Sequence, residues 1–115
     1  MGKSQRDKGK RGELLLARAL REEGYDCRRT AQYCGKSGDA SDVVGLPGIH
    51  IECKFVERLN VREALGQAKR DAKPDLLPGV FHKTSNAEWL VTMSLSDFMK
   101  VYRGEIDETC ATHGT

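Results

Sequence analysis

The sequence lacks any apolar run close to the roughly 20 residues that a membrane-spanning helix needs. The first residues, Met-Gly-Lys-Ser-Gln-Arg-Asp-Lys, contain no apolar stretch of the kind found in secretory signal peptides. None of the 4 cysteines has the short C-x₂₋₄-C spacing of a zinc site, and a cytosolic chain keeps its thiols reduced. We therefore expect a cytoplasmic protein with no membrane partner, no disulfides and no structural zinc.

Cofactor fingerprints are also missing. The chain has no Gly-rich phosphate loop and no Ser-His-Asp arrangement. The histidines, His50, His82 and His113, show no metal-ligand spacing. His50 is expected on the same strand face as Glu52 and Lys54, where it either touches substrate or is solvated.

Charge is unevenly distributed in the 115 residues, although the formal net charge is only +2. Basic residues crowd the start of the chain and recur in a second cluster near Lys36: Lys3, Arg6, Lys8, Lys10 and Arg11, then Arg28 and Arg29. Such patches can neutralise nucleic-acid phosphates, or they can simply be solvated. Composition leaves both explanations open.

Apolar periodicity predicts helices over about 8–23, 61–72 and 95–102. Gly24 ends the first helix, while Asn60 and Ser94 are N-cap residues of the other two. Strands are expected at 25–29, 42–45, 49–56, 79–82 and 88–93, with a loop at 31–41. A tight turn at 46–48 should join 42–45 and 49–56 as an antiparallel hairpin.

This order of helices and strands predicts an α/β fold, a small mixed sheet with helices on its faces. The length fits a single domain over 1–115. Residues 1–7 are expected to form a flexible basic arm, and 104–115 a flexible tail. The late apolar residues Phe81, Trp89, Leu90 and Phe98 could supply either an interface or only the core.

The strand at 49–56 contains the main candidates for catalytic residues. It alternates strictly, so Glu52 and Lys54 should project from one face, roughly 7 Å apart at the backbone. A carboxylate there can hold a divalent metal, and a lysine can orient or deprotonate a water. Alone, the pair is equally consistent with an ion pair on an exposed strand.

Asp42 strengthens the case for a site. The hairpin should bring it near Glu52, and two close carboxylates repel unless a cation lies between them. Hard oxygen ligands favour Mg²⁺ or Mn²⁺. Asp39 competes for this role, but only Asp42 directly precedes the apolar Val43-Val44 strand. Alternatively, Asp42 simply ends a turn.

Two helical residues complete the candidate set. Glu13 shares an otherwise apolar helical stripe, where it needs either a metal or a basic partner from another element. It could instead sit in the first turn and complement the helix dipole, which the pattern alone favours. Gln67 lies at the edge of the apolar stripe of the second helix. Its side chain could hydrogen-bond a catalytic carboxylate or a phosphate, or it could simply be exposed.

In this order, Gly9-Lys-Arg-Gly-Glu13, Asp42, Ile51-Glu-Cys-Lys54 and Gln67 resemble PD-(D/E)XK nucleases, which have a restriction-endonuclease-like core. More narrowly, residues 8 to 100 resemble archaeal-type Holliday junction resolvases and their small phage-encoded relatives. Ser41 stands where the family usually has proline. The resemblance implies that Asp42, Glu52 and the Cys53 carbonyl bind Mg²⁺ (Mn²⁺ possible), with help from Glu13. Lys54 would activate water, Gln67 would assist, and the early basic residues would contact DNA.

The function implied is a Mg²⁺-dependent endodeoxyribonuclease acting on branched DNA, such as a four-way junction. Symmetric cutting of two strands would need a homodimer. One alternative is a structure-insensitive or nicking nuclease in phage or plasmid DNA processing. Another is a non-catalytic DNA-binding module, against which the intact Asp, Glu and Lys set argues.

Overall fold

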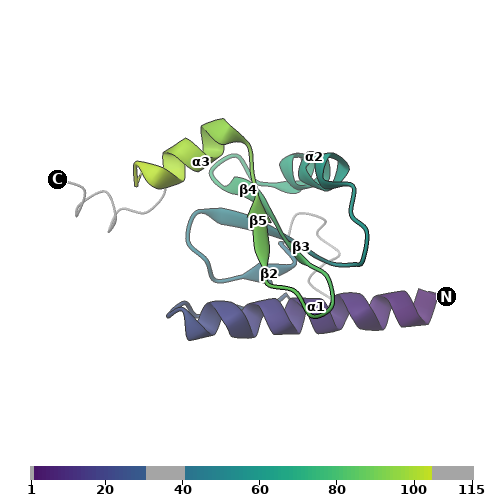
Figure 1. Cartoon of the computed structure of the whole chain (residues 1–115). Helices are drawn as coiled ribbons and strands as arrows, with labels where there is room; N and C mark the ends of the chain where they lie inside the picture. Colours follow the sequence, from purple (N-terminus) through teal and green to yellow (C-terminus); the bar gives the residue numbers. More distant parts are fainter. Residues whose placement is uncertain (1, 31–40, 105–115) are drawn as a thin grey trace.

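The computed structural model of the protein describes residues 2–30 and 41–104, with side chains from Asp7 onward. A five-stranded sheet has α1 on one face and α2 on the other (Figure 1). This confirms the expected α/β class with a small mixed sheet flanked by helices. The elements in chain order are α1 (Gly2–Glu22), β1 (Arg28–Arg29), β2 (Val43–Val44), β3 (Ile49–Phe55), α2 (Val61–Asp71), β4 (Leu77–Lys83), β5 (Leu90–Thr92) and α3 (Leu95–Tyr102).

The strands lie in the sheet in their sequence order, β1 to β5. The predicted hairpin is confirmed, since β2 and β3 pair antiparallel with Val43 opposite Ile51. Pairs β1–β2 and β4–β5 are also antiparallel. β3 and β4 are parallel, because α2 carries the chain back before β4 begins. β3 is therefore an interior strand with a neighbour on each side.

Helix α1 is longer than the sequence predicted. It begins at Gly2 rather than near Lys8, so residues 2–7, which we expected to precede the helix as a basic arm, are part of it. Half of those residues are lysine, glutamine and arginine, which have good helix propensity and continue the helix backward. Its end agrees with the prediction: Gly24 follows with a φ of +104°, a left-handed conformation that glycine adopts without strain.

Two apolar clusters hold the layers together. One lies between α1 and the sheet, around Leu16, Ala17 and Ile51, and it also contains the buried Phe81. The other lies under α2 and is formed by Ala64, Ala68 and Val80. Because both faces of the sheet are covered, β3 is buried on both. His50 and Glu52 are only 1% and 5% exposed, so an ion pair on an exposed strand, and a solvated His50, are wrong.

Several strand boundaries differ from the predictions. The strand expected at 25–29 is reduced to β1, and that expected at 88–93 to β5. β4 begins earlier than 79 and includes Pro78. Proline is tolerated there because β5 pairs only with Val80 to His82, so nothing in β5 needs an N–H from Pro78. The caps of α2 and α3 are as predicted, with the side chains of Asn60 and Ser94 accepting from Glu63 and Asp97.

Helix α3 follows β5 and has no buried residue. In the described ranges, no helix combines the length and apolar character required to cross a bilayer. Residues 31–40 of the expected loop at 31–41 and nearly all of the expected tail at 104–115 lie outside the described residues, as do Lys36, Asp39 and His113.

Candidate active site

A cleft of about 500 Å³ opens beside the C-terminal half of β3. All five residues predicted to be catalytic line it, and they come from α1, the position before β2, β3 and α2: Glu13, Asp42, Glu52, Lys54 and Gln67. Lys8, Gly9, Cys53, Phe55 and Val56 complete the lining. Sequence-distant polar residues thus meet in one place. The hairpin predicted this for Asp42 and Glu52, whereas only the family resemblance implied it for Glu13 and Gln67.

Asp42 lies immediately before β2, and the backbone of β3 holds it on both sides. Its N–H donates to the carbonyl of Ile51 at 3.0 Å, and its Oδ2 accepts from the N–H of Cys53 at 2.8 Å. Burial raises the pKa of the Asp42 carboxyl to about 6, and the nearby Glu52 and Glu13 add to the rise. The hydrogen bond from Cys53 and the charge of Lys54 act in the opposite direction. The site therefore crowds negative charge that water no longer stabilises.

Glu52 and Lys54 project from the same face of β3, as the alternation predicted. The Lys54 Nζ lies 3.6 Å from Oε2 of Glu52. The glutamate side chain is only 7% exposed, whereas the lysine side chain is 30% exposed. The carboxylate is thus buried, and the lysine side chain beside it reaches solvent.

Glu13 is held by a basic residue from another element. Its Oε1 accepts from the Nε of Arg29 on β1 at 2.7 Å, and both side chains are mostly buried. The alternative that Glu13 complements the dipole in the first turn is wrong, because α1 begins at Gly2. Close packing brings the helix to the sheet here: a Cβ on Gly12 would lie 2.5 Å from the Cβ of Phe55.

The donor set suits a small divalent cation. Within residues 2–30 and 41–104, no group of three or more His, Cys, Asp and Glu side chains is placed to hold a metal ion. Mg²⁺ typically takes one or two carboxylates and keeps several waters, and Asp42 and Glu52 can supply two. Glu13 is engaged by Arg29, so its help in metal binding stays a prediction, as does that of the Cys53 carbonyl.

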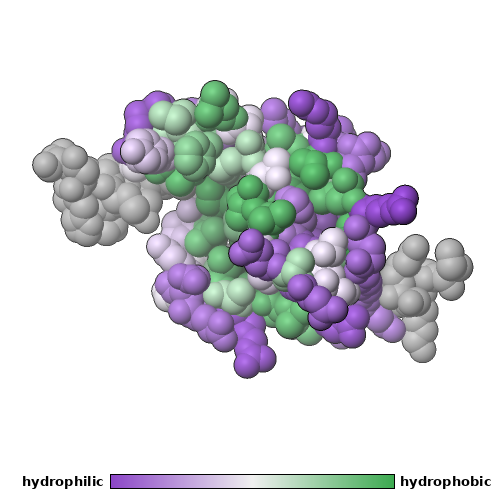
Figure 2. Space-filling view, in the orientation of Figure 1, coloured by the Kyte–Doolittle hydropathy of each residue, from purple (hydrophilic) through white to green (hydrophobic). Residues whose placement is uncertain are grey.

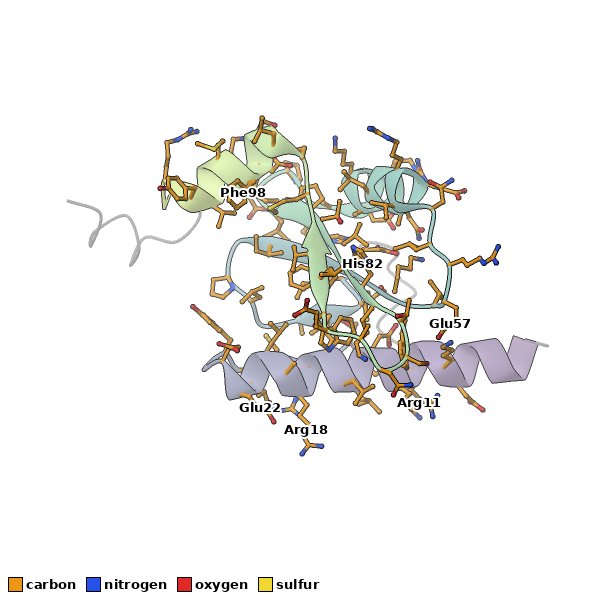
Figure 3. All side chains as sticks on the ribbon, in the orientation of Figure 1. Arg11, Arg18, Glu22, Glu57, His82 and Phe98 are labelled. Atoms are coloured by element: carbon orange, nitrogen blue, oxygen red, sulfur yellow. The ribbon has the colours of Figure 1, made fainter. Side chains whose placement is uncertain are left out.

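The predicted DNA-contacting residues fall into different settings. Lys8 and Arg11 lie over the ring of Phe55, at 5.2 and 5.8 Å from its centroid, and Lys8 also pairs with Glu57 at 3.5 Å. Figure 3 shows Arg11 and Glu57 toward the N-terminal half of α1, whereas Arg18 and Glu22 project from the helix's outer side. Lys10 is exposed. Lys3 and Arg6 lie in α1, but their side chains are outside the described part.

The two arginines of the second basic cluster, Arg28 and Arg29, have different surroundings. Arg28 is exposed and only 3.6 Å from the exposed carboxylate of Asp26, so it can still meet a phosphate. Arg29 is mostly buried against Glu13, which gives it a structural role instead.

Sequence reasoning missed the partner of His50. Its Nδ1 lies 2.9 Å from the hydroxyl of Ser41, and both residues are buried. Ser41 precedes β2 and His50 lies within β3, so no local pattern in the sequence signalled this contact.

Comparison of the chain with protein-family models, curated proteins and solved structures finds no match. The resemblance to PD-(D/E)XK nucleases therefore rests on the motif residues.

Proposed function

We propose that the protein is a metal-dependent endodeoxyribonuclease whose active site is the cleft around Asp42, Glu52 and Lys54. The proposal rests on the observation that the residues predicted to be catalytic lie together. Residues 13, 42, 52, 54 and 67 were selected from the sequence for one chemistry, and they line one cleft. Glu52 is buried, while Asp42 and Lys54 are partly buried, and these charges have no evident purpose in stability, since burying charge without a full partner costs free energy.

The position of each residue in the cleft suggests its role. Asp42 and Glu52 would hold Mg²⁺ or Mn²⁺, which when bound polarises the phosphodiester and neutralises its developing charge. Lys54, at the solvent side of Glu52, would orient the attacking water or take its proton. Gln67 at the cleft edge would hydrogen-bond a phosphate oxygen or a carboxylate. Lys8 at the cleft and the exposed Lys10, Arg11 and Arg28 would contact the DNA backbone.

Branched DNA is the proposed substrate, by resemblance, with the cytoplasm as the place of action. Cutting two strands symmetrically calls for two copies of the site. A surface formed by β5 and α3 supports such a dimer, because apolar side chains reach the surface over these elements (Figure 2). Leu95 and Tyr102 are 74% and 76% exposed. Of the candidate interface residues, Phe81 lies in the core and Trp89 packs against it, whereas Leu90 and Phe98 are exposed.

A cleavage assay tests the proposal. Labelled four-way junction and linear duplex of the same sequence are incubated with the protein in Mg²⁺, in Mn²⁺ and in EDTA. We expect metal-dependent cleavage of the junction and slower cleavage of the duplex. Equal rates on both would favour a structure-insensitive nuclease, and binding to either DNA without metal-dependent cleavage would leave only the DNA-binding module.

A further inference from the structure

Among the side chains of the described residues, one nitrogen or oxygen atom is buried without a hydrogen-bond partner, the Nε2 of His50. The residue is 1% exposed, so it lies out of reach of bulk solvent. An unsatisfied polar atom at such depth costs about 1–3 kcal/mol. A buried imidazole in this state needs an explanation, and its neighbours on β3 provide one.

The unpartnered nitrogen faces the candidate active site. The Nε2 of His50 lies 3.8 Å from Oε1 of Glu52, while the Nζ of Lys54 lies 3.6 Å from Oε2. The glutamate carboxylate therefore lies between two nitrogen-bearing side chains of its own strand face, one at each oxygen. A shift of about 0.6 Å would bring the two atoms to the long end of the hydrogen-bond range.

The opposite nitrogen of the ring is fixed. The hydroxyl of Ser41 lies 2.9 Å from Nδ1, and a hydroxyl can donate to an unprotonated ring nitrogen. Ser41 is itself held, because the side chain of Thr30 donates to its carbonyl. A nitrogen lone pair facing a carboxylate oxygen would be repelled, so the proton belongs on Nε2.

We propose that His50 is a positioning residue. Ser41 holds its imidazole with an N–H at Nε2, and that N–H fixes the carboxylate of Glu52 for metal binding. Groups that hydrogen-bond a metal-ligating carboxylate orient it, and their loss typically lowers metal affinity or activity 10- to 100-fold. Ser41 directly precedes Asp42 in the chain. The same serine therefore links the backbone at one proposed metal ligand, Asp42, to His50, the residue that orients the other, Glu52.

The inference rests on the proposed metal site, and two variants of His50 separate it from a merely structural role. His50→Gln places an amide nitrogen where it can reach Glu52. His50→Asn keeps a polar atom near Ser41 but cannot reach Glu52. His82→Asn is the control, since His82 is a part-buried histidine on β4 that bonds Thr92 rather than the site.

The readout is Mn²⁺ affinity, measured by calorimetry without DNA, together with the Tm of each metal-free variant. We expect the Asn variant to bind Mn²⁺ at least about 10-fold more weakly than wild type. The Gln variant should recover most of that loss at a similar Tm, and His82→Asn should bind as wild type. Equal affinity of the wild type and the Asn variant would overturn the positioning role. Absence of Mn²⁺ binding to wild type would overturn the proposed metal site, and this inference with it.

Two further measurements cover the case in which the His50 variants do not fold. Long-range ¹H–¹⁵N NMR of the imidazole of the metal-free wild type should show the proton on Nε2, and a ring with its proton on Nδ1 alone would contradict the assignment. Ser41→Ala should weaken Mn²⁺ binding, and Ser41→Thr, which keeps the hydroxyl, should restore it. Unchanged binding by Ser41→Ala would count against the proposal.

Discussion

The Oδ2 of Asp42 accepts a 2.8 Å hydrogen bond from the backbone N–H of Cys53, which ties the start of β2 to the middle of β3. This bond keeps the carboxylate in the cleft although the neighbouring Glu52 and Glu13 repel its charge. The fold thus holds an ionised group where it is unfavourable without a cation. Sites that bind ligands often carry such a cost in stability.

Asp42→Asn should make the metal-free protein more stable at pH 7.5 while abolishing cleavage. A pKa raised from 3.8 to about 6 corresponds to about 3 kcal/mol of lost stability at neutral pH. The asparagine oxygen can still accept from Cys53, so the charge is removed and the bond is kept. We expect the Tm in EDTA to rise by at least about 4 °C. Asp75→Asn, at an exposed aspartate, is the matched control, and an unchanged or lower Tm for Asp42→Asn would contradict the account.

The gain in Tm should depend on pH. Below 3.8 the Asp42 carboxyl is protonated in both the folded and the unfolded chain, and it contributes nothing. Between 3.8 and about 6 the unfolded chain loses its proton first, so the wild type loses stability as pH rises. Above about 6 the loss is complete. The difference in Tm between Asp42→Asn and wild type should therefore be near zero at pH 3.5 and largest above pH 6.

Gly12→Ala should destabilise the protein and disturb the site. The new Cβ would lie 2.5 Å from the Cβ of Phe55, so α1 must move away from β3 and carry Glu13 with it. Such overpacking costs about 1–3 kcal/mol. Gly9→Ala is the control, because nothing lies within 4 Å of its added Cβ, and alanine favours the helix. Denaturant titration of both variants tests this, and equal stabilities would show that the contact does not matter.

Arg29→Ala should cost about 2 kcal/mol, because it leaves the mostly buried carboxylate of Glu13 without its partner. Arg28→Ala, which removes an exposed side chain next in sequence, should change stability by less than about 0.5 kcal/mol. We expect the reverse order in DNA affinity: Arg28→Ala should bind DNA more weakly than Arg29→Ala. Equal unfolding free energies for the two variants would contradict the different roles assigned to them.

Much of the fold followed from local patterns. Alternation defined β3, and the capping residues Asn60 and Ser94 located the starts of α2 and α3. These features depend on residues close in sequence, which is why the chain alone predicted them. The start of α1 was missed because only helix propensity supports residues 2–7, with no apolar stripe to mark them.

The candidate site was predicted in its members but not in its contacts. The hairpin brings Asp42 to Glu52, and that follows from a short turn. The pairing of Glu13 with Arg29 and of Ser41 with His50 depends on how β1 and β2 pack, which no periodicity reveals. The burial of His50 was missed for a similar reason, since it depends on α2 covering the second face of the sheet.

Phe98→Glu should weaken self-association if the β5–α3 surface forms the proposed dimer. Phe98 is 46% exposed and stacks with Tyr102 at 6.2 Å between ring centroids, on a helix with no buried residue. Leu14→Glu, at a 49% exposed leucine on α1, is the control. Sedimentation equilibrium should show a dimer for wild type and Leu14→Glu and a monomer for Phe98→Glu. A wild type that is monomeric at assay concentration would contradict the dimer.

Metal-dependent cleavage by Glu52→Gln, compared with wild type and with Lys54→Ala on the same four-way junction in Mg²⁺, tests the central claim most directly. Each variant is first shown to fold, by its Tm, and to bind the junction in EDTA. We expect wild type to cut and both variants to bind yet cut at least about 100-fold more slowly, since each loses one group of the proposed machinery. Wild-type rates of cleavage by Glu52→Gln would place the chemistry elsewhere and contradict the account.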